Sequence, residues 1–307
     1  MKILAKVISS YHIELLLQNG IKPKYFLING KDERLLKLIN ENFKKVDFIF
    51  FDSERKEFNI FSSRRFNKKL YKTSKEKLLN INFDCLILFT DNKPFDKFLI
   101  DFGLDNKVII ELWEDGLGHY IGAGTSKFFF KNIIKFFLGY YSKSILSDTY
   151  KRDQIIIKNR FDKKNIIYNT NFESNKKPIS NKGILFIGQP LVEDGYISSA
   201  NYINKILDIQ THFNIKVNYL PHPRENLDKY KETKFTVVTT KMNAENYCVI
   251  NKYEYYISAF STTLLNINQF NNSYYIPSYF GLNKIHKLLK GLSFLPILVA
   301  NNLEDVK

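Results

Sequence analysis

The sequence is poor in cysteine, with only Cys85 and Cys248 in 307 residues. Two cysteines cannot form a disulfide framework, and both lie in apolar, strand-like runs, so reduced thiols in a reducing cytosol are predicted. No apolar run reaches the roughly 18–20 residues that a membrane span needs. The 13 glycines and 8 prolines exclude a collagen-like or linker-like chain. The start, Met1–Leu4, runs into a strand-then-helix pattern and not a signal peptide. Together these features predict an intracellular globular protein.

Several motifs of metal and cofactor sites are also missing. No two aspartates are separated by one residue, so the metal-binding Asp-x-Asp of many sugar-nucleotide enzymes is absent. His-Glu-x-x-His, cysteine pairs at zinc spacing and a Gly-x-x-x-x-Gly-Lys phosphate loop are absent too. The sequence therefore predicts chemistry by acid, base and helix dipole, with no metal and no cofactor.

Positive charge and aromatic residues are plentiful. Lys and Arg number 46 against 31 Asp and Glu, for a net charge of +15, and 15% of residues are aromatic. A hydrophobic content of 44% excludes a disordered chain. The charge suggests nucleic acid, an anionic membrane surface or an anionic small molecule as partner, or only a coding bias toward lysine.

Apolar strand-like runs alternate with stretches of helical periodicity in both halves of the chain. Such alternation predicts parallel sheets with crossover helices, hence an α/β fold. The polar segment 169–182, interrupted by Pro178, is typical of a linker. We therefore predict two α/β domains in tandem, 1–174 and 175–307. The expected strands are 3–9, 25–28, 46–51, 85–89, 108–112, 184–188, 217–220, 235–239, 255–259, 274–276 and 297–300. The expected helices are 11–18, 32–43, 65–79, 202–213 and 262–270.

Ligands of open α/β sheets bind beyond the carboxyl ends of the strands. The run 108–112 leads into Glu114, Asp115 and Gly116. One of the two carboxylates could act as a general base, or Asp-Gly could form a simple turn. The run 217–220 leads into Pro221-His222-Pro223-Arg224. There the prolines fix the presentation of His222, either for a phosphate or merely as a rigid turn.

Two further strand ends carry candidate donor-binding residues. Ser261 and Thr262 precede an apolar helical run, so they can cap that helix, bind phosphate at its N-terminus, or do both. The run 184–188 ends in Gly188 and Gln189. A second acidic-acidic-Gly triplet at 193–195 ranks lower, because no strand directly precedes it.

The ordered set acidic-acidic-Gly, His-Pro and Ser-Ser/Thr resembles the shared motifs of bacterial sialyltransferases and polysialyltransferases with GT-B architecture. The resemblance implies two Rossmann-like domains that face each other across a cleft. The wording of residues 114–118, 186–190 and 221–225 looks most like glycosyltransferase family 52. That family contains lipooligosaccharide and capsule sialyltransferases of about this length.

The resemblance implies a role for each motif. Glu114, with Asp115 as the second choice, would be the general base on the acceptor hydroxyl. His222 would contact the CMP phosphate as acid or charge stabiliser, with Pro223 and Arg224 beside it. Ser261 and Thr262 would bind the same phosphate, although Ser-Thr-Thr stands in place of Ser-Ser and leaves the register open by one residue. Glu245 would hold the ribose, with Glu254 as a competitor.

The implied function is an inverting, metal-independent transfer of sialic acid from CMP-sialate to a galactoside on lipooligosaccharide or capsule. Domain 1–174 would bind the acceptor and domain 175–307 the CMP-sugar. The alternatives are a transferase of the same fold with another nucleotide sugar, such as a glucosyltransferase, a catalytically dead nucleotide-binding scaffold, or a basic protein that binds nucleic acid or membrane. No nucleic-acid motif is present, so nucleic acid is not an expected partner. We expect a lipid-linked acceptor, a homodimer and a cytoplasmic location at the inner membrane. The aromatic and basic segment 128–141 is either a buried helix or the membrane contact.

Overall fold

The structure, a computed structural model, describes residues 1–30, 32–51, 60–91, 94–117, 155–158, 178–240, 242–267, 272–293 and 295–306. Contacts divide the chain into two compact units. Of the described residues, 1–115 and 155–158 belong to the first unit, and 116–117 and 178–306 belong to the second. The predicted boundary at 174/175 and the segment 128–141 lie outside the described residues.

The first unit contains a parallel six-stranded sheet in the order β3-β2-β1-β4-β5-β6. Its strands are β1 (Ile3–Lys6), β2 (Tyr25–Asn29), β3 (Asp47–Phe51), β4 (Cys85–Leu88), β5 (Ile109–Trp113) and β6 (Ile155–Lys158). The order changes direction between β1 and β4, which is the switch point where open sheets of this kind bind ligands. β1 and β4 are buried along their whole length, as expected for central strands covered on both faces.

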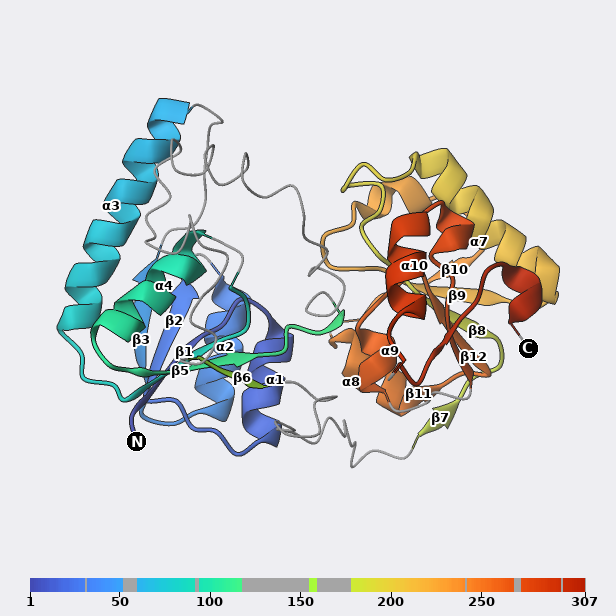
Figure 1. The fold of residues 1–307 in the computed structure, drawn as a ribbon. Coiled ribbons are helices and arrows are strands. Elements are labelled where there is room, and N and C mark those ends of the chain that lie inside the picture. Colours follow the sequence, from blue (N-terminus) through green and yellow to red (C-terminus); the bar gives the residue numbers. More distant parts are fainter. Residues whose placement is uncertain are drawn as a thin grey trace. The chain divides into compact units, whose positions relative to one another are not determined.

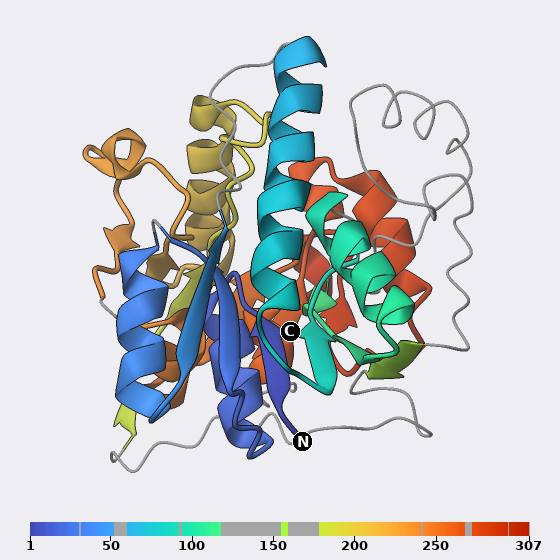
Figure 2. The ribbon, with the colours of Figure 1, turned by 90° about the vertical axis from the view of Figure 1, so that its left-hand side faces the viewer.

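Helices cover both faces of this sheet (Figure 1). They are α1 (Ser10–Gln18), α2 (Glu33–Asn42), α3 (Ile60–Leu79) and α4 (Pro94–Asp105). Successive side chains of a strand point to opposite faces, so Ile3 and Ala5 pack with buried residues of α1 and α2, while Leu4 packs with those of α3 and α4. Figure 2 looks onto the face that carries α3 and α4.

The second unit repeats the design, with a parallel sheet in the order β10-β9-β8-β12-β13-β14. Its strands are β8 (Ile184–Ile187), β9 (Val217–Leu220), β10 (Thr236–Val237), β12 (Tyr255–Ser258), β13 (Ser273–Tyr275) and β14 (Leu298–Val299). A separate two-stranded sheet pairs β7 (Ile179–Ser180) with β11 (Asn251–Lys252). The switch point here lies between β8 and β12.

The helices of the second unit include one long element, α7, and several short ones. They are α7 (Ser199–Phe213), α8 (Ala244–Ile250), α9 (Thr263–Asn266) and α10 (Asn283–Lys290), with 3-10 turns η3 (Leu227–Tyr230), η5 (Ser278–Phe280) and η6 (Leu303–Asp305). In both units, parallel strands alternate with helices, which confirms the predicted α/β class. Among the described residues, no helix is long and apolar enough to cross a membrane.

Each strand predicted from an apolar run is present, with ends shifted by a few residues. The predicted helix 262–270 is found as the four-residue α9, which ends at Asn266 with Ile267 as its C-cap; residues 268–271 lie outside the described residues. Sequence patterns missed the strands β6, β7 and β11 and the helices α4, α8 and α10. In α4 the apolar residues 98–100 are consecutive and 102 follows closely, and Gly103 lies within the helix. The helical periodicity of its apolar residues is therefore weak.

Candidate functional site

Glu114 and Asp115 follow β5 at the carboxyl edge of the first sheet, and their side chains differ in exposure. Glu114 is fully buried, at 0% exposure. The Asp115 side chain is 37% exposed. A base that takes a proton from an incoming hydroxyl must be reachable by it, so the geometry favours Asp115 over Glu114, which the sequence analysis had preferred.

A histidine that the sequence analysis did not single out contacts Asp115. His12, in the first turns of α1, brings Nε2 to 2.6 Å from Asp115 Oδ1. The His12 side chain is fully buried, and its ring stacks on Phe89 with centroids 3.9 Å apart. Ser9, the N-cap of α1, accepts a hydrogen bond from the backbone N–H of His12 and so fixes the start of the helix. Ends of β1, β4 and β5 thereby supply His12, Phe89 and Asp115 to one place.

In the second unit, His222 lies in a turn after β9 that a buried carboxylate holds. Glu225 Oε1 accepts a hydrogen bond from the backbone N–H of His222 at 2.7 Å. Glu225 Oε2 accepts from the hydroxyls of Tyr219 at 2.7 Å and Tyr230 at 2.5 Å. Lys229 adds an ammonium 3.2 Å from the same oxygen. The turn is therefore fixed by Glu225 as well as by its prolines.

Gly188 follows β8 and lies directly beside this cluster. A Cβ on Gly188 would come within 2.5 Å of the Tyr219 hydroxyl and 2.6 Å of Glu225 Oε1. Gln189 is next, and its backbone N–H donates to the Tyr202 hydroxyl at 3.4 Å. The glycine predicted as a donor-binding residue is thus also required for packing the tyrosine–glutamate cluster.

The protonation of His222 follows from its surroundings. Its Nδ1 accepts a hydrogen bond from the backbone N–H of Arg224 at 3.1 Å, so Nε2 carries the proton of the neutral ring. Burial, followed by the positive charge of Arg224, lowers the pKa of His222 below its usual value. At neutral pH the ligand-free ring is therefore a neutral donor through Nε2 and not a cation.

Arg224 and the second acidic triplet form a clamp on the same turn. The Arg224 guanidinium makes a bidentate ion pair with Asp194, with N–O distances of 2.9 and 3.0 Å. Glu193 accepts from the backbone N–H of Asn226 and from Lys229, both at 2.9 Å. Burial raises the pKa of Glu193, but these two donors outweigh it and the pKa is lowered overall. The positive charges of Arg224 and Lys229 are therefore countered by acidic side chains.

Ser261, Thr262 and Glu245 are brought together at the carboxyl end of β12. Ser261 Oγ accepts from the backbone N–H of Thr263 at 3.3 Å. Glu245, on α8, accepts from the Thr263 hydroxyl at 3.1 Å and from the Asn266 amide at 2.9 Å. Its competitor Glu254 precedes β12 and so lies at the opposite, amino end of that strand.

Thr262 also contacts the residues that follow the first acidic pair. Its hydroxyl accepts from the backbone N–H of Leu117 at 2.9 Å. Gly116 has φ of +73°, and a Cβ there would lie 2.5 Å from the Thr262 side chain. Glycine is needed at this position both for its left-handed conformation and for the close approach to Thr262.

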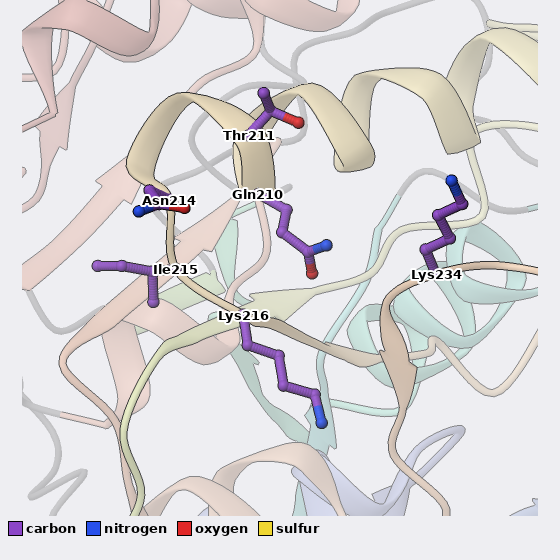
Figure 3. A pocket seen from close by; sticks show the side chains of 6 residues that line it. All are labelled: Gln210, Thr211, Asn214, Ile215, Lys216 and Lys234. Carbon is purple, nitrogen blue, oxygen red and sulfur yellow. The ribbon is translucent and has the colours of Figure 1, made fainter.

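A surface pocket of about 510 Å³ lies elsewhere in the second unit (Figure 3). Its lining comes from the end of α7, the start of β9 and the segment before β10: Gln210, Thr211, Asn214, Ile215, Lys216 and Lys234. This is the amino end of β9, whereas His222 follows its carboxyl end. Within the described ranges, no group of three or more His, Cys, Asp or Glu side chains is arranged to hold a metal ion.

Comparison with known families places these residues in context. The model of glycosyltransferase family 52 matches residues 27–278. The chain belongs to glycosyltransferase family 52. Its matched range includes both carboxylates after β5, His222 and the Ser261–Thr262 pair, and it leaves out α1 with His12. No curated protein sequence matches the chain.

Solved structures show the fold of this family 52 glycosyltransferase. The glycotransferase of kitacinnamycin is 7% identical, with a TM-score of 0.54 over 99% of this chain and 87% of that one. The spinosyn forosaminyltransferase SpnP is 8% identical, with a TM-score of 0.54 over 100% and 88%. The Methanocaldococcus jannaschii UDP-GlcNAc 2-epimerase, solved with UDP-GlcNAc and UDP, is 12% identical, with a TM-score of 0.53 over 95% and 92%. The fold is GT-B, with two Rossmann-like sets of parallel strands, as predicted.

Sequence reasoning about this family 52 enzyme missed His12 and the anchoring contact of Glu225, and it ranked the triplet that contains Glu193 and Asp194 too low. A signal existed for His12, which interrupts the apolar face of the predicted helix 11–18. For Glu225 the signal was weaker, a carboxylate three residues after His222. Nothing in the sequence connects Asp194 with Arg224, because their contact depends on the sheet bringing the ends of β8 and β9 together.

Proposed function

We propose that this glycosyltransferase transfers sialic acid from CMP-sialate to a galactoside-type acceptor, with inversion and without a metal ion. The main support for this proposal is that the Asp115 carboxylate is exposed to an incoming hydroxyl and is held by the buried His12. The choice of donor draws on the ordered motifs at 114–118, 221–225 and 261–262 in a chain of family 52.

Asp115 is proposed as the general base. Its carboxylate takes the proton of the acceptor hydroxyl as the hydroxyl oxygen bonds to the anomeric carbon, and the bond from that carbon to the phosphate oxygen breaks with its electron pair leaving on CMP. A positioned base contributes about 10²–10⁴ in rate. Glu114 is not proposed in this role because its side chain is fully buried.

His222 is proposed to stabilise the leaving phosphate. Its Nε2–H is the donor that remains when Nδ1 accepts from Arg224. The bound phosphate would raise the pKa of His222 and let it act as an acid late in the bond cleavage. Arg224 could contact the phosphate only after its ion pair with Asp194 opens. The Arg224 side chain is 61% exposed, so opening this pair costs little free energy.

The remaining donor contacts are proposed for the hydroxyls of Ser261 and Thr262 and for Glu245. Helix α9 has four residues, so the phosphate contact rests on hydroxyl groups more than on a helix dipole. Glu245 accepts hydrogen bonds from Thr263 and Asn266, so its carboxylate is held close to Ser261 and Thr262. We propose that it binds the ribose hydroxyls there. Gln189 and Pro223 flank the same edge.

The test is release of CMP from CMP-sialate, measured with and without lactose and in the presence of EDTA. Product formation that persists in EDTA and depends on lactose is expected. A requirement for added divalent metal would contradict the metal-free reaction. Thermal shift with CMP against UDP separates the donors, because a ligand stabilises the fold according to its occupancy; stabilisation by UDP alone would favour a different nucleotide sugar.

We further propose that the acceptor is lipid-linked lipooligosaccharide or capsule and that the enzyme works at the cytoplasmic face of the inner membrane, with the homodimer as its oligomeric state. Co-sedimentation with anionic liposomes at low salt tests the membrane contact, and lack of binding would contradict it. Sedimentation velocity tests the homodimer, which a monomer at micromolar protein concentration would contradict.

A further inference from the structure

We infer that His12 is the positioning residue of the reaction: its Nε2–H holds one oxygen of Asp115 so that the other faces the acceptor hydroxyl. This inference rests on the proposed role of Asp115 as base. His12 lies outside the range matched by the family model, and its part in the site follows from the tertiary contact alone.

Three contacts fix the His12 ring. Phe89 stacks on it with an angle of 9° between the ring planes. The backbone N–H of Ile8 donates to Nδ1 at 3.3 Å. Because two N–H groups cannot donate to each other, Nδ1 carries the lone pair and Nε2 carries the proton. The third contact is that of Nε2 with Asp115 Oδ1 at 2.6 Å, so His12 is the donor and the carboxylate is the acceptor.

The direction of this hydrogen bond assigns the two roles. His12 is fully buried, so an acceptor sugar cannot reach its ring, whereas the Asp115 side chain is 37% exposed. His12 keeps its proton throughout, and the proton of the acceptor hydroxyl goes to Oδ2 of Asp115. The imidazole orients the carboxylate, since the bond to Oδ1 restricts rotation of the carboxyl group.

The first arm of the test is independent of any substrate. In protein labelled with ¹⁵N-histidine, His12 is expected to show the tautomer with Nε2 protonated and a slowly exchanging Nε2–H. In Asp115→Ala that proton is expected to shift and exchange faster, because it loses its acceptor. An Nδ1-protonated ring, or a signal unchanged in Asp115→Ala, would overturn the inference.

The second arm compares His12→Gln with His12→Phe. Both replacements fill the buried slot, but only glutamine can present an N–H near the position of Nε2. His12→Phe is expected to lower kcat about 10²-fold with KM for the donor unchanged, the cost of a misoriented reacting group. His12→Gln is expected to recover part of that loss. The exposed His212 at the end of α7 supplies the control His212→Asn, with wild-type kinetics.

A double variant tests whether the two residues act as a unit. In the Asp115→Asn background, His12→Phe is expected to cause little additional loss of kcat. Equal losses in His12→Gln and His12→Phe at unchanged unfolding temperature, or a full additional loss on top of Asp115→Asn, would overturn the positioning role. If CMP-sialate gave no product with the wild type, the proposed donor would be wrong. The same comparison would then run with UDP-glucose, and the NMR arm would still decide the pairing.

Discussion

The carboxylate of Glu225 holds the backbone of His222, with 2.7 Å between Glu225 Oε1 and the amide nitrogen. Both residues belong to the turn after β9, and Glu225 is buried against the hydroxyls of Tyr219 and Tyr230. The turn that presents His222 is therefore anchored from inside the second unit, and its geometry depends on a residue that no substrate needs to touch.

Replacing Glu225 tests this anchor. Glu225→Gln is expected to destabilise the fold by about 1–3 kcal/mol, because one amide N–H must face a donor in a buried place. Urea denaturation measures the change. Tyr230→Phe is the matched control, removing one hydroxyl from the cluster while leaving the bond to His222. A larger loss of CMP affinity in Tyr230→Phe than in Glu225→Gln would contradict the anchoring role.

Separate substitutions of the two adjacent carboxylates distinguish their roles. Asp115→Asn is expected to reduce transfer by about 10²–10⁴, the contribution of a general base. Glu114→Gln alters a fully buried side chain, so its main effect is expected on the unfolding temperature. Steady-state kinetics and thermal unfolding of both variants check this. Loss of turnover in Glu114→Gln alone would return the base to Glu114.

The low pKa of His222 predicts a pH dependence with a definite sign. Burial and Arg224 lower this pKa in the folded chain, so the unfolded chain binds more protons in the range below the ordinary value of 6.5. The contribution of His222 to folding is complete above that value and is lost as pH falls through the lowered folded pKa. NMR titration of its ring should give a midpoint below 6.5, rising when CMP binds. A midpoint above 6.5 without ligand would contradict the structure.

Both cysteine thiols are expected to be inert in the folded protein. Burial, with a smaller effect of Glu111, raises the pKa of Cys85 to about 12, and burial raises that of Cys248 well above its usual value. The thiolate is the reactive form. A thiol reagent at pH 8 should label neither residue in native protein and both in denaturant. Rapid native labelling of either would show that its strand opens easily.

A buried ion pair at the carboxyl end of β1 should contribute strongly to the stability of the first unit. Lys6 pairs with Asp96 of α4, and the Thr90 hydroxyl donates to the same carboxylate at 2.6 Å. Lys6→Met leaves Asp96 as an uncompensated buried charge, a change that costs about 3–5 kcal/mol. Lys24→Met, which removes an exposed pair with Asp47, serves as the control with little expected effect. Equal unfolding midpoints for the two variants would contradict this.

The sequence by itself determined the class of fold and which polar residues follow the carboxyl ends of its strands. Apolar runs such as 85–89 and 184–188 have the length and composition of buried parallel strands, and polar residues directly after them must lie at the carboxyl edge of a sheet. That reasoning placed the Glu114–Asp115 pair, His222 and Ser261 after the carboxyl ends of strands without any coordinates, because strand direction and side-chain alternation are local properties.

Tertiary structure alone decided which of these side chains are exposed and which residues contact them. The choice between Glu114 and Asp115 depends on burial, which adjacent residues of the same charge do not reveal. His12 meets Asp115 across 103 positions of sequence because β1 and β5 both flank β4. Arg224, predicted to lie beside the donor phosphate, is paired with Asp194 because the sheet brings the ends of β8 and β9 together. Pattern and composition indicate whether a segment forms a strand, a helix or a turn. Only the packing of distant segments determines which charged side chains are exposed, which are paired and which direction they face.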